Sequence, residues 1–342
     1  MRTIKVFMSC ILAISMTILS SGTVFAVDDN RTTAALPMAM TSAEIAEFLE
    51  NAEPVPMPSS NNNVESSRTR TGSYGYNMET GEVQFNSFTE DDYFCTENSS
   101  AGYTPDSLID KQIKYDDITE PKGIVGTDDR VQVTNTSIGP WCNTVKLLIT
   151  AGNGGSYVGS GFMIGPNSVA TSGHCVYDST TGGWASSITV IPALNGTTQP
   201  FGSATSYYLE CGGDWYNYTD NQDDWGIIRI NANLGSSTGW LGLRWQSSSY
   251  NGTTVNAVGY PASDGTHMYY GSGTVNTSSA RTLSGDWDLT GGQSGGPVEK
   301  YYSDTGYTAL GINRGGGSTY SDCLRIDQWI YNKLMSYRSL TY

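Results

Sequence analysis

From about residue 123 onward, short apolar stretches alternate with segments rich in Gly, Ser, Thr and Asn. Each apolar stretch holds only four to six residues, which is short for a core helix but typical of a strand. Turn residues separate the stretches, and the chain contains 40 glycines. The pattern predicts an all-β fold, a sandwich or a barrel. The stretches are 144–149, 161–164, 187–191, 226–230, 254–258 and 309–312.

Helical spacing is found near both ends of the chain. Thr41 and Glu44 have the spacing of a capping box, and apolar residues follow at helical intervals, so a short helix is expected there. One amphipathic helix is predicted at about 325–338, where apolar residues recur at the same intervals. These residues are Ile45, Phe48 and Leu49 in the first helix, and Leu324, Trp329, Ile330, Leu334 and Tyr337 in the second.

Residues 1–26 have the composition of a secretory signal peptide. Arg2 and Lys5 precede a mainly apolar run at 6–19, and Val24-Phe25-Ala26 has the small residues of a cleavage site. The alternative is a retained anchor, but the run is short for a span of about 20 residues. No later stretch is long and apolar enough to cross a membrane. We therefore expect a secreted, extracellular protein with no membrane contact once the signal is removed.

Most of the net charge lies in one segment. The chain carries −15, and residues 27–122 account for −12 with 6 basic and 18 acidic side chains. Residues 123–342 carry only −5, from 10 basic and 15 acidic side chains. Such acidity argues against a nucleic-acid partner, because phosphate contacts need clustered Lys and Arg. It also separates an acidic segment (residues 27–122) from the strand-rich remainder.

The cysteines agree with export. Cys10 lies in the signal and Cys95 in the acidic segment, which leaves four in the remainder. Two disulfides are expected in an oxidising compartment, with three pairings open. The four candidates are Cys142, Cys175, Cys211 and Cys323.

Three segments carry the residues of nucleophilic acyl transfer. His174 follows a strand-like stretch, Asp224 precedes one, and Ser294 lies in the glycine-rich loop 291–297. A serine hydroxyl needs a histidine base, and the histidine needs a carboxylate that fixes its tautomer. Flanking glycines let backbone N–H groups converge on an oxyanion. Each piece alone is more often structural, but the order His, Asp, Ser between strands favours a catalytic set.

These segments resemble the secreted bacterial glutamyl endopeptidases, a branch of the chymotrypsin-like serine proteases. The resemblance begins at about Ile124 and runs to the C-terminal helix, leaving out the acidic segment. The similar motifs are Asp128-Asp129-Arg130, Met163-Ile164-Gly165-Pro166, Ser172-Gly173-His174-Cys175, Asp224-Trp225-Gly226, Gly259-Tyr260-Pro261 and 291–297.

The resemblance implies two antiparallel six-stranded β-barrels, at about 130–235 and 240–325, with the active site between them. It implies a serine endopeptidase acting on protein or peptide substrates. His174 would be the general base and acid, Asp224 its orienting partner and Ser294 the nucleophile, with the N–H groups of Gly292 and Ser294 as the oxyanion hole. It also implies a zymogen, with residues 27–122 as an inhibitory pro-segment. An activating protease would cut at Lys122-Gly123 or Gly123-Ile124, leaving 123–342 as the protease domain.

Substrate specificity stays open. The S1 candidates implied by the resemblance are Leu289, Asn313, Arg314 and Gly315, and Asn313 stands where the family places a histidine for glutamate. Arg314 either offers a positive charge to an acidic P1 side chain or points to solvent. One hypothesis is that the acidic pro-segment covers Arg314 before activation.

No metal and no cofactor are expected. The chain has two His and no HExxH motif, and its acidic cluster does not have EF-hand spacing. The remaining alternative is a secreted binding or adhesion module on a protease fold without turnover. The acidic cluster consists of Asp214, Asp220, Asp223 and Asp224.

Overall fold

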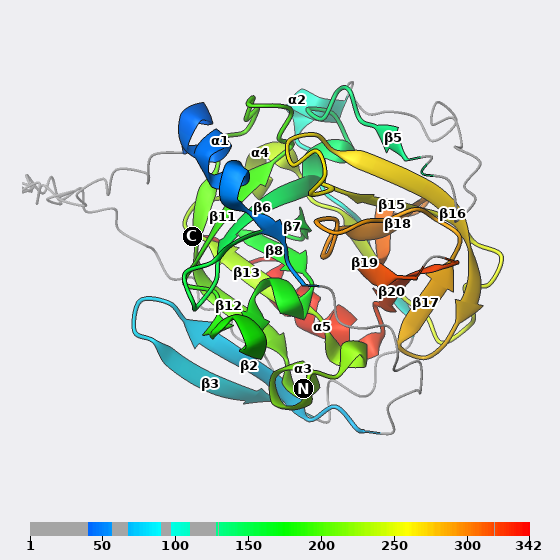
Figure 1. The fold of residues 1–342 in the computed structure, drawn as a ribbon. Helices are drawn as coiled ribbons and strands as arrows, with labels where there is room; N and C mark the ends of the chain where they lie inside the picture. Colours follow the sequence, from blue (N-terminus) through cyan, green and yellow to red (C-terminus); the bar gives the residue numbers. More distant parts are fainter. Residues whose placement is uncertain (1–39, 57–67, 90–96, 110–127, 129, 318) are drawn as a thin grey trace, which may run out of the picture. The chain divides into compact units, whose positions relative to one another are not determined.

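Strands are the main secondary structure of the described chain. The computed structural model describes residues 40–56, 68–89, 97–109, 128, 130–317 and 319–342 (Figure 1). The expected signal peptide, Cys10, Cys95 and the expected cutting points at 122–124 lie outside the described residues. Among the described residues, no helix is both long enough and apolar enough to span a membrane.

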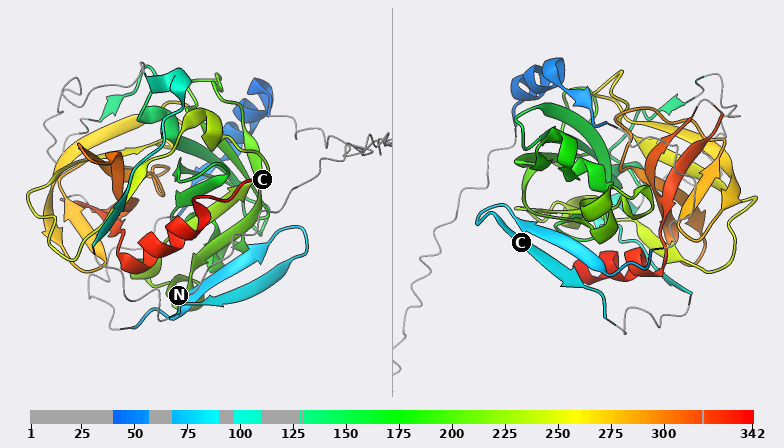
Figure 2. Two further views of the ribbon diagram at one scale, coloured as in Figure 1. Left: turned by 180° about the vertical axis from the view of Figure 1, so that it is seen from behind. Right: turned by 60° about the horizontal axis from the view of Figure 1, so that its bottom comes forward.

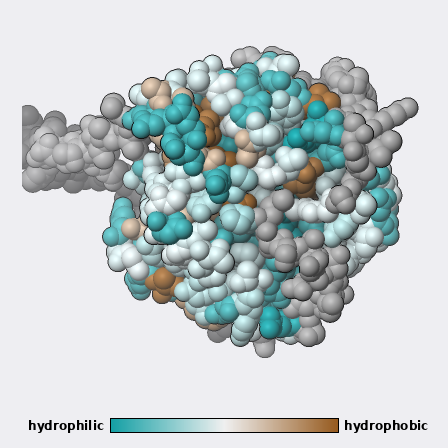
Figure 3. Space-filling view, viewed as in Figure 1, coloured by the Kyte–Doolittle hydropathy of each residue, from teal (hydrophilic) through white to brown (hydrophobic). Residues whose placement is uncertain are grey.

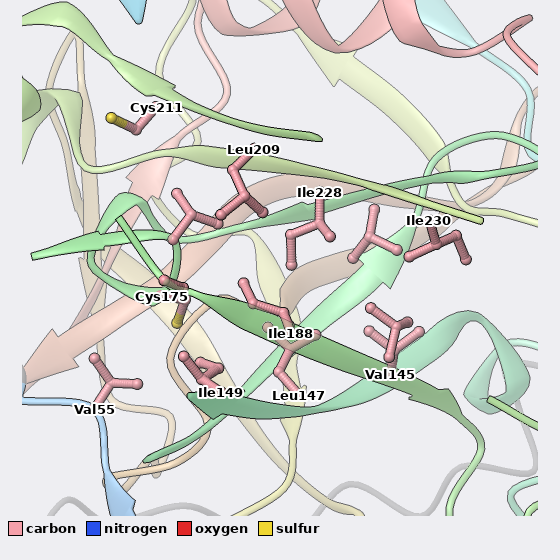
Figure 4. Close-up of a cluster of buried hydrophobic side chains, with 14 of the residues drawn as sticks. Val55, Val145, Leu147, Ile149, Cys175, Ile188, Leu209, Cys211, Ile228 and Ile230 are labelled. Atoms are coloured by element: carbon pink, nitrogen blue, oxygen red, sulfur yellow. The ribbon is translucent and has the colours of Figure 1, made fainter. Parts of the chain in front are cut away.

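Six antiparallel strands form the first barrel. Their order is β11-β6-β7-β8-β13-β12, and pairing of β12 with β11 closes it. Inward side chains of these strands pack together in the first core, part of which Figure 4 shows. The strands are β6 (Thr144–Thr150), β7 (Ser156–Met163), β8 (Ser168–Thr171), β11 (Ser187–Pro192), β12 (Ala204–Gly212) and β13 (Gly226–Ile230).

The second barrel repeats this plan. Its order is β18-β15-β16-β17-β20-β19, closed by pairing of β18 with β19, so the predicted pair of six-stranded antiparallel barrels is confirmed. Every apolar stretch singled out in the sequence falls on a strand of one barrel or the other, although the stretch 161–164 extends one residue beyond β7. The strands are β15 (Thr254–Gly259), β16 (Tyr269–Ser278), β17 (Thr282–Gly285), β18 (Pro297–Tyr302), β19 (Gly306–Gly316) and β20 (Ser321–Arg325).

The C-terminal helix α5 (Gln328–Tyr337) is present, but it begins later than predicted. Leu324 belongs to β20, and Asp327 caps the helix by accepting hydrogen bonds from the N–H groups of Trp329 and Ile330. The helix buries Ile330 and Leu334 in a core shared by both barrels.

Short elements connect the barrel strands. The strands are β5 (Val131–Gln132), β9 (Tyr177–Asp178), β10 (Gly183–Trp184) and β14 (Gly242–Trp245). The α-helices are α3 (Gly213–Tyr218) and α4 (Gly235–Thr238), and the 3₁₀ helices are η3 (Trp141–Asn143), η4 (Gly173–Cys175), η5 (Ser179–Thr181) and η6 (Asn221–Asp223).

The acidic segment is more structured than its sequence indicates. The predicted capping box is present, with Thr41 and Glu44 at the start of α1 (Ser42–Asn51). The segment also adds strands to both sheets, which the sequence did not predict (Figure 2). Its remaining elements are β1 (Glu53–Pro54), β2 (Gly72–Asn77), β3 (Glu82–Ser87), β4 (Asn98–Ser100) and α2 (Asp106–Ile109).

The added strands of the acidic segment form because each has a partner strand in the strand-rich part of the chain. β1 pairs in parallel with β7, the β2–β3 hairpin pairs with β12, and β4 pairs with β14. Outside the barrels, such short polar strands have too little apolar surface of their own to be stable. On the face in Figure 3, hydrophobic residues form small separate areas rather than one broad patch.

The expectation of two disulfides is wrong for the four described cysteines. All four thiols are free and buried. They lie in different surroundings: Cys175 and Cys211 in the first core, Cys323 in the second and Cys142 beside Leu108. Burial raises the pKa of Cys142 to about 12, so that thiol is held in its neutral form.

The second barrel contains a buried carboxyl group without a partner. Glu299 on β18 is 1% exposed, and neither oxygen has a hydrogen-bond partner among the described residues. Burial raises the pKa of Glu299 to about 8.

Replacing Glu299 with Gln should change how stability depends on pH. The unfolded chain loses this proton near pH 4.5, whereas the folded chain keeps it to about pH 8. The folded state therefore binds more protons in that window, and its stability falls as pH rises. Between pH 5 and 7 the free energy of unfolding should fall more in the parent than in Glu299→Gln, by roughly 1–2 kcal/mol. Urea denaturation at several pH values measures the free energy of unfolding. The prediction is contradicted if that free energy falls equally with pH in the parent and in Glu299→Gln, or if the exposed control Glu82→Gln reduces the fall as much as Glu299→Gln does.

Candidate active site

Strand register brings His174 and Asp224 together. β8 and β13 are antiparallel neighbours, with Thr171 opposite Gly226. His174 follows Thr171 by three residues and Asp224 precedes Gly226 by two, so both emerge at the same end of the pair. The Nδ1 atom of His174 lies 2.8 Å from Oδ2 of Asp224, and the backbone N–H of His174 donates to Oδ1 at 2.8 Å. Asp224 thus fixes both the ring and the backbone of His174.

Burial intensifies this interaction. Asp224 is fully buried and His174 is 3% exposed. Burial alone would lower the pKa of His174. The charge of Asp224 and the contact with Cys175 raise the pKa by more than burial lowers it, so the net shift is upward. The pair therefore stabilises a protonated imidazole, which a general base needs after taking a proton.

The loop around Ser294 passes very close to neighbouring backbone. Gly292 and Gly295 have positive φ angles of 94° and 84°. A Cβ atom on Gly295 would lie 2.0 Å from Oγ1 of Thr171, and one on Gly292 would lie 2.5 Å from the backbone nitrogen of Ala262. These glycines are therefore required by conformation and by space, and the loop is not merely a flexible turn.

Hydrogen bonds fix the loop to the first barrel. Ser160 on β7 donates its N–H to the carbonyl of Ser294 at 2.8 Å and its hydroxyl to the carbonyl of Gly292 at 2.9 Å. The hydroxyl of Ser172 bonds to the carbonyl of Asn313 at 2.8 Å, and Asn313 also accepts from the N–H of Gly295. Sequence reasoning missed Ser160 and the role of Ser172, because lone serines in strands carry no signal of such a contact.

Two reactive atoms in this region have no partner. The Nε2 atom of His174 and the Oγ atom of Ser294 are buried, and neither has a hydrogen-bond partner among the described residues. The structure therefore joins His174 to Asp224 but does not join either to the Ser294 hydroxyl by a hydrogen bond. Catalytic hydrogen bonds of this kind often form only with substrate bound, and buried unpaired atoms are otherwise rare.

Arg130 supports the nucleophile loop from the other side. Its guanidinium donates to Oγ1 of Thr290 at 2.5 Å and to Oε1 of Gln293 at 2.7 Å, and it pairs with Asp128 at 2.6 Å. The motif Asp128-Asp129-Arg130 therefore contributes through Arg130 to the loop that holds Ser294.

The four S1 candidates make different contacts in the second barrel. Leu289 packs against the second core, and the amide of Asn313 donates to the carbonyl of Val258 at 3.1 Å. Gly315 pairs with Asp322 across β19 and β20. Arg314 lines a pocket whose walls also include Ser284, Thr319 and Tyr320.

Arg314 neither points to solvent nor stays unpaired. It lies at an irregularity in the β19–β20 register and is 6% exposed. Its guanidinium makes two hydrogen bonds to Asp322, at 3.1 and 2.8 Å, and a third to the carbonyl of Asn221 at 2.6 Å. Since its described contacts lie in the strand-rich part, they give no support to the hypothesis that the acidic segment covers Arg314.

The acidic segment instead reaches His174 and the nucleophile loop. Val55 donates its N–H to the carbonyl of Val158 at 3.1 Å and is 4% exposed. Its side chain packs in the first core near Cys175 (Figure 4) and, with His174, lines a space of only about 10 Å³, the limit for one water. Pro54 lies against Gly291, since a Cβ there would be 3.0 Å from Cβ of Pro54.

The remaining acidic residues have roles other than metal binding in this structure. Asp220 caps η6, and Asp223 pairs with Arg70 at 2.6 Å. In the part of the chain that the structure describes, no three His, Cys, Asp or Glu side chains are grouped so that they could hold a metal ion.

Comparison with known proteins identifies relatives of this arrangement. A family model described as a trypsin-like peptidase domain matches residues 159–301, which include His174, Asp224 and Ser294. An extracellular metalloprotease of Bacillus subtilis (strain 168) is 40% identical over 221 residues, covering 63% of this chain and 69% of that protein. A glutamyl endopeptidase of Bacillus licheniformis is 35% identical over 229 residues, covering 64% of this chain and 70% of that protein. The solved structure of a Glu endopeptidase in complex with MPD matches with a TM-score of 0.55 and 25% identity, over 63% of this chain and 98% of that one.

Replacing Asp224 with Asn should lower the pKa of His174 below that of an ordinary histidine. The substitution removes the charge that raises the pKa and leaves the burial that lowers it. An NMR titration of the imidazole signals measures this, and the chain has only two histidines to assign. The signals of His267 should not change, and an unaltered His174 titration would show that the pair is not coupled.

Proposed function

The chain belongs to the family of trypsin-like serine endopeptidases, and we propose that it cleaves peptide bonds with His174, Asp224 and Ser294 as its catalytic residues. The observation that carries this proposal is the buried contact between His174 and Asp224. Among the described residues, the Nε2 atom of His174 and the hydroxyl of Ser294 have no hydrogen-bond partner. Contacts from Ser160 hold the loop of Ser294 against the strand beside His174.

The chemistry follows from these positions. Nε2 of His174 takes the proton of the Ser294 hydroxyl while Oγ attacks the substrate carbonyl, and Asp224 stabilises the resulting imidazolium. The N–H groups of Gly292 and Ser294 bind the oxyanion. Neither N–H donates a hydrogen bond within the described residues, so both are available for that role. His174 then gives its proton to the leaving amine, and water releases the acyl group by the reverse sequence.

We also propose that the protein is exported as a zymogen with residues 27–122 as its pro-segment. The support is the position of Pro54 beside Gly291 and of Val55 beside His174. With the pro-segment present, Ser294 is fully buried and His174 nearly so. The pro-segment would therefore exclude substrate until an activating protease removes it. Export is supported by the composition of residues 1–26 and by the name of the relative from Bacillus subtilis.

For the P1 residue we propose a preference for Glu or Asp. The support is the name of the Bacillus licheniformis relative and the position of Arg314 in the wall of a pocket. Asp322 already neutralises most of the charge on Arg314, so the preference should be modest.

The catalytic assignment predicts how the serine reacts with a fluorophosphonate probe. Secreted, processed protein should be labelled at Ser294, whereas full-length protein should not, because the hydroxyl is buried. Ser294→Ala should abolish labelling and reduce peptide hydrolysis by about 10⁶-fold, and Ser303→Ala provides a matched control. N-terminal sequencing of the labelled species should begin at Gly123 or Ile124.

Two results would contradict this proposal. Turnover retained by Ser294→Ala would remove Ser294 as the nucleophile. Processed protein that takes no label and cleaves nothing would favour the alternative, a binding module on a protease fold.

Cleavage-site profiling on a peptide library tests the P1 proposal. Glu and Asp should exceed Ala at P1 by about tenfold in kcat/KM, which corresponds to about 1.4 kcal/mol. Restoring the family histidine with Asn313→His should raise this ratio. A preference for aromatic or aliphatic P1 residues would refute the specificity proposal and leave the catalytic one intact.

A further inference from the structure

An arginine of the pro-segment is completely buried in the protease domain. The side chain of Arg70, which precedes β2, is 0% exposed. Its Nε lies 2.6 Å from Oδ1 of Asp223, and its two terminal nitrogens donate to Oδ2 of Asp327 and to the carbonyl of Gln222. The whole guanidinium is thus held by two carboxylates and one carbonyl of residues 222–327.

The partners of Arg70 are held in place by the protease domain itself. Asp327 caps α5 through the N–H groups of Trp329 and Ile330. Asp223 accepts from the N–H of Asp214 at 2.9 Å and from the indole of Trp225 at 2.8 Å. Because these contacts do not involve the pro-segment, the carboxylates should keep their positions when Arg70 leaves. They form a preorganised site for a planar cation.

The geometry selects a guanidinium over other cations. Its two terminal nitrogens donate hydrogen bonds to Asp327 and Gln222, and its Nε forms an ion pair with Asp223, so one extended guanidinium reaches three separate oxygens. An ammonium, in contrast, is a compact point charge. A second arginine, Arg281, lies near this site, and burial and the charge of Arg70 lower its pKa. Its own guanidinium instead donates to the backbone carbonyl of Arg68 at 2.6 Å.

The hairpin after Arg70 binds the same domain over a wider surface. Residues 73–77 of β2 pair with 208–212 of β12. Side chains add to this pairing, since Ser73 and Asn86 donate to the buried carboxylate of Glu210. Aromatic rings stack across the same contact, at centroid distances of 4.1 Å for Tyr74–Tyr216, 5.4 Å for Tyr76–Trp184 and 4.9 Å for Phe88–Trp329.

The contacts near His174 are slighter by comparison. There β1 pairs with β7 over only two residues. The pro-segment therefore contacts the protease domain through two separate parts. One is residues 40–55, which bury Ile45 and Val55, and the other is residues 68–88 around Arg70.

We propose that Asp223, Asp327 and the carbonyl of Gln222 form a guanidinium-binding site, and that Arg70 in this site keeps residues 68–88 bound after the chain is cut near residue 123. This inference rests on the proposed zymogen. It means that cutting the chain and releasing the pro-segment are separate steps, with Arg70 controlling the second. Once the hairpin has left, the site is open to an arginine side chain or an alkylguanidinium.

Retention can be measured on the full chain. A recognition sequence for an unrelated protease is inserted at Lys122-Gly123 in a Ser294→Ala background, and the folded chain is cut. The two pieces should co-elute in size-exclusion chromatography at micromolar concentration. Arg70→Ala should weaken their association at least tenfold and Arg70→Lys less. The matched control Arg68→Ala should weaken it less than twofold, because that side chain is 52% exposed and contacts Asp220 at 3.9 Å and the exposed ring of Tyr218.

A second measurement needs no variant at Arg70, and it tests the proposed guanidinium-binding site even if Arg70→Ala does not fold. Ethylguanidinium at tens of millimolar should speed release of the hairpin piece at least threefold over ethylammonium at the same ionic strength. The proposal is overturned if the two ions act equally, if the pieces separate on cutting, or if Arg70→Ala folds and behaves as Arg68→Ala does.

The proposed function is tested separately in a parallel sample with Ser294 intact. After cutting, release of the hairpin piece in excess ethylguanidinium and chromatographic separation in that ion, fluorophosphonate should label the protease domain whatever residue stands at position 70. Labelling without selective retention would refute the Arg70 inference alone. Retention without labelling would refute the catalytic assignment alone.

Discussion

The contact between the Ser294 loop and the first barrel is the constraint on which the site depends. The loop belongs to one barrel and His174 to the other, so their relative position is set where the barrels meet. Backbone groups of the loop bond to Ser160, and a Cβ on Gly295 would collide with Thr171. Two closed barrels are rigid on their own, and close backbone contact between them leaves little freedom for His174 and the Ser294 loop to move apart.

Much of the fold and the candidate site could be predicted because the relevant signals are local. Apolar stretches of strand length and a capping box at Thr41 depend on neighbouring residues, and both appear in the structure. The closeness of His174 to Asp224 follows from one strand register, and the motifs around them are recognisable by order.

What the sequence could not predict depends on partners far along the chain. Ser160 is one of many serines, and only the folded chain brings it 2.9 Å from the carbonyl of Gly292. The four thiols were expected to form disulfides because of the expected signal peptide, but pairing requires proximity. Cys142 and Cys323 lie in two different clusters, and Cys175 and Cys211 are both free although they share the first core. Arg314 looked available in sequence because Asp322, eight residues later, gives no sign that it folds back as a partner.

Charge totals were similarly misleading about the acidic segment. Its −12 suggested contact through acidic side chains, yet the most buried ionic contact it makes uses its own Arg70 against two aspartates. Removing one partner of a buried ion pair leaves an uncompensated buried charge, whereas exposed ion pairs contribute little free energy.

The pairing of β2 with β12 has a consequence for solubility. Along one side of β12, residues 204–205 pair with β11 to close the barrel, and residues 208–212 pair with β2. If the hairpin departs, that second stretch becomes an open sheet edge whose unpaired amides and carbonyls can template a strand from another molecule. A hairpin that stays in place would therefore also guard against aggregation, and its loss would leave the mature protein more prone to self-association.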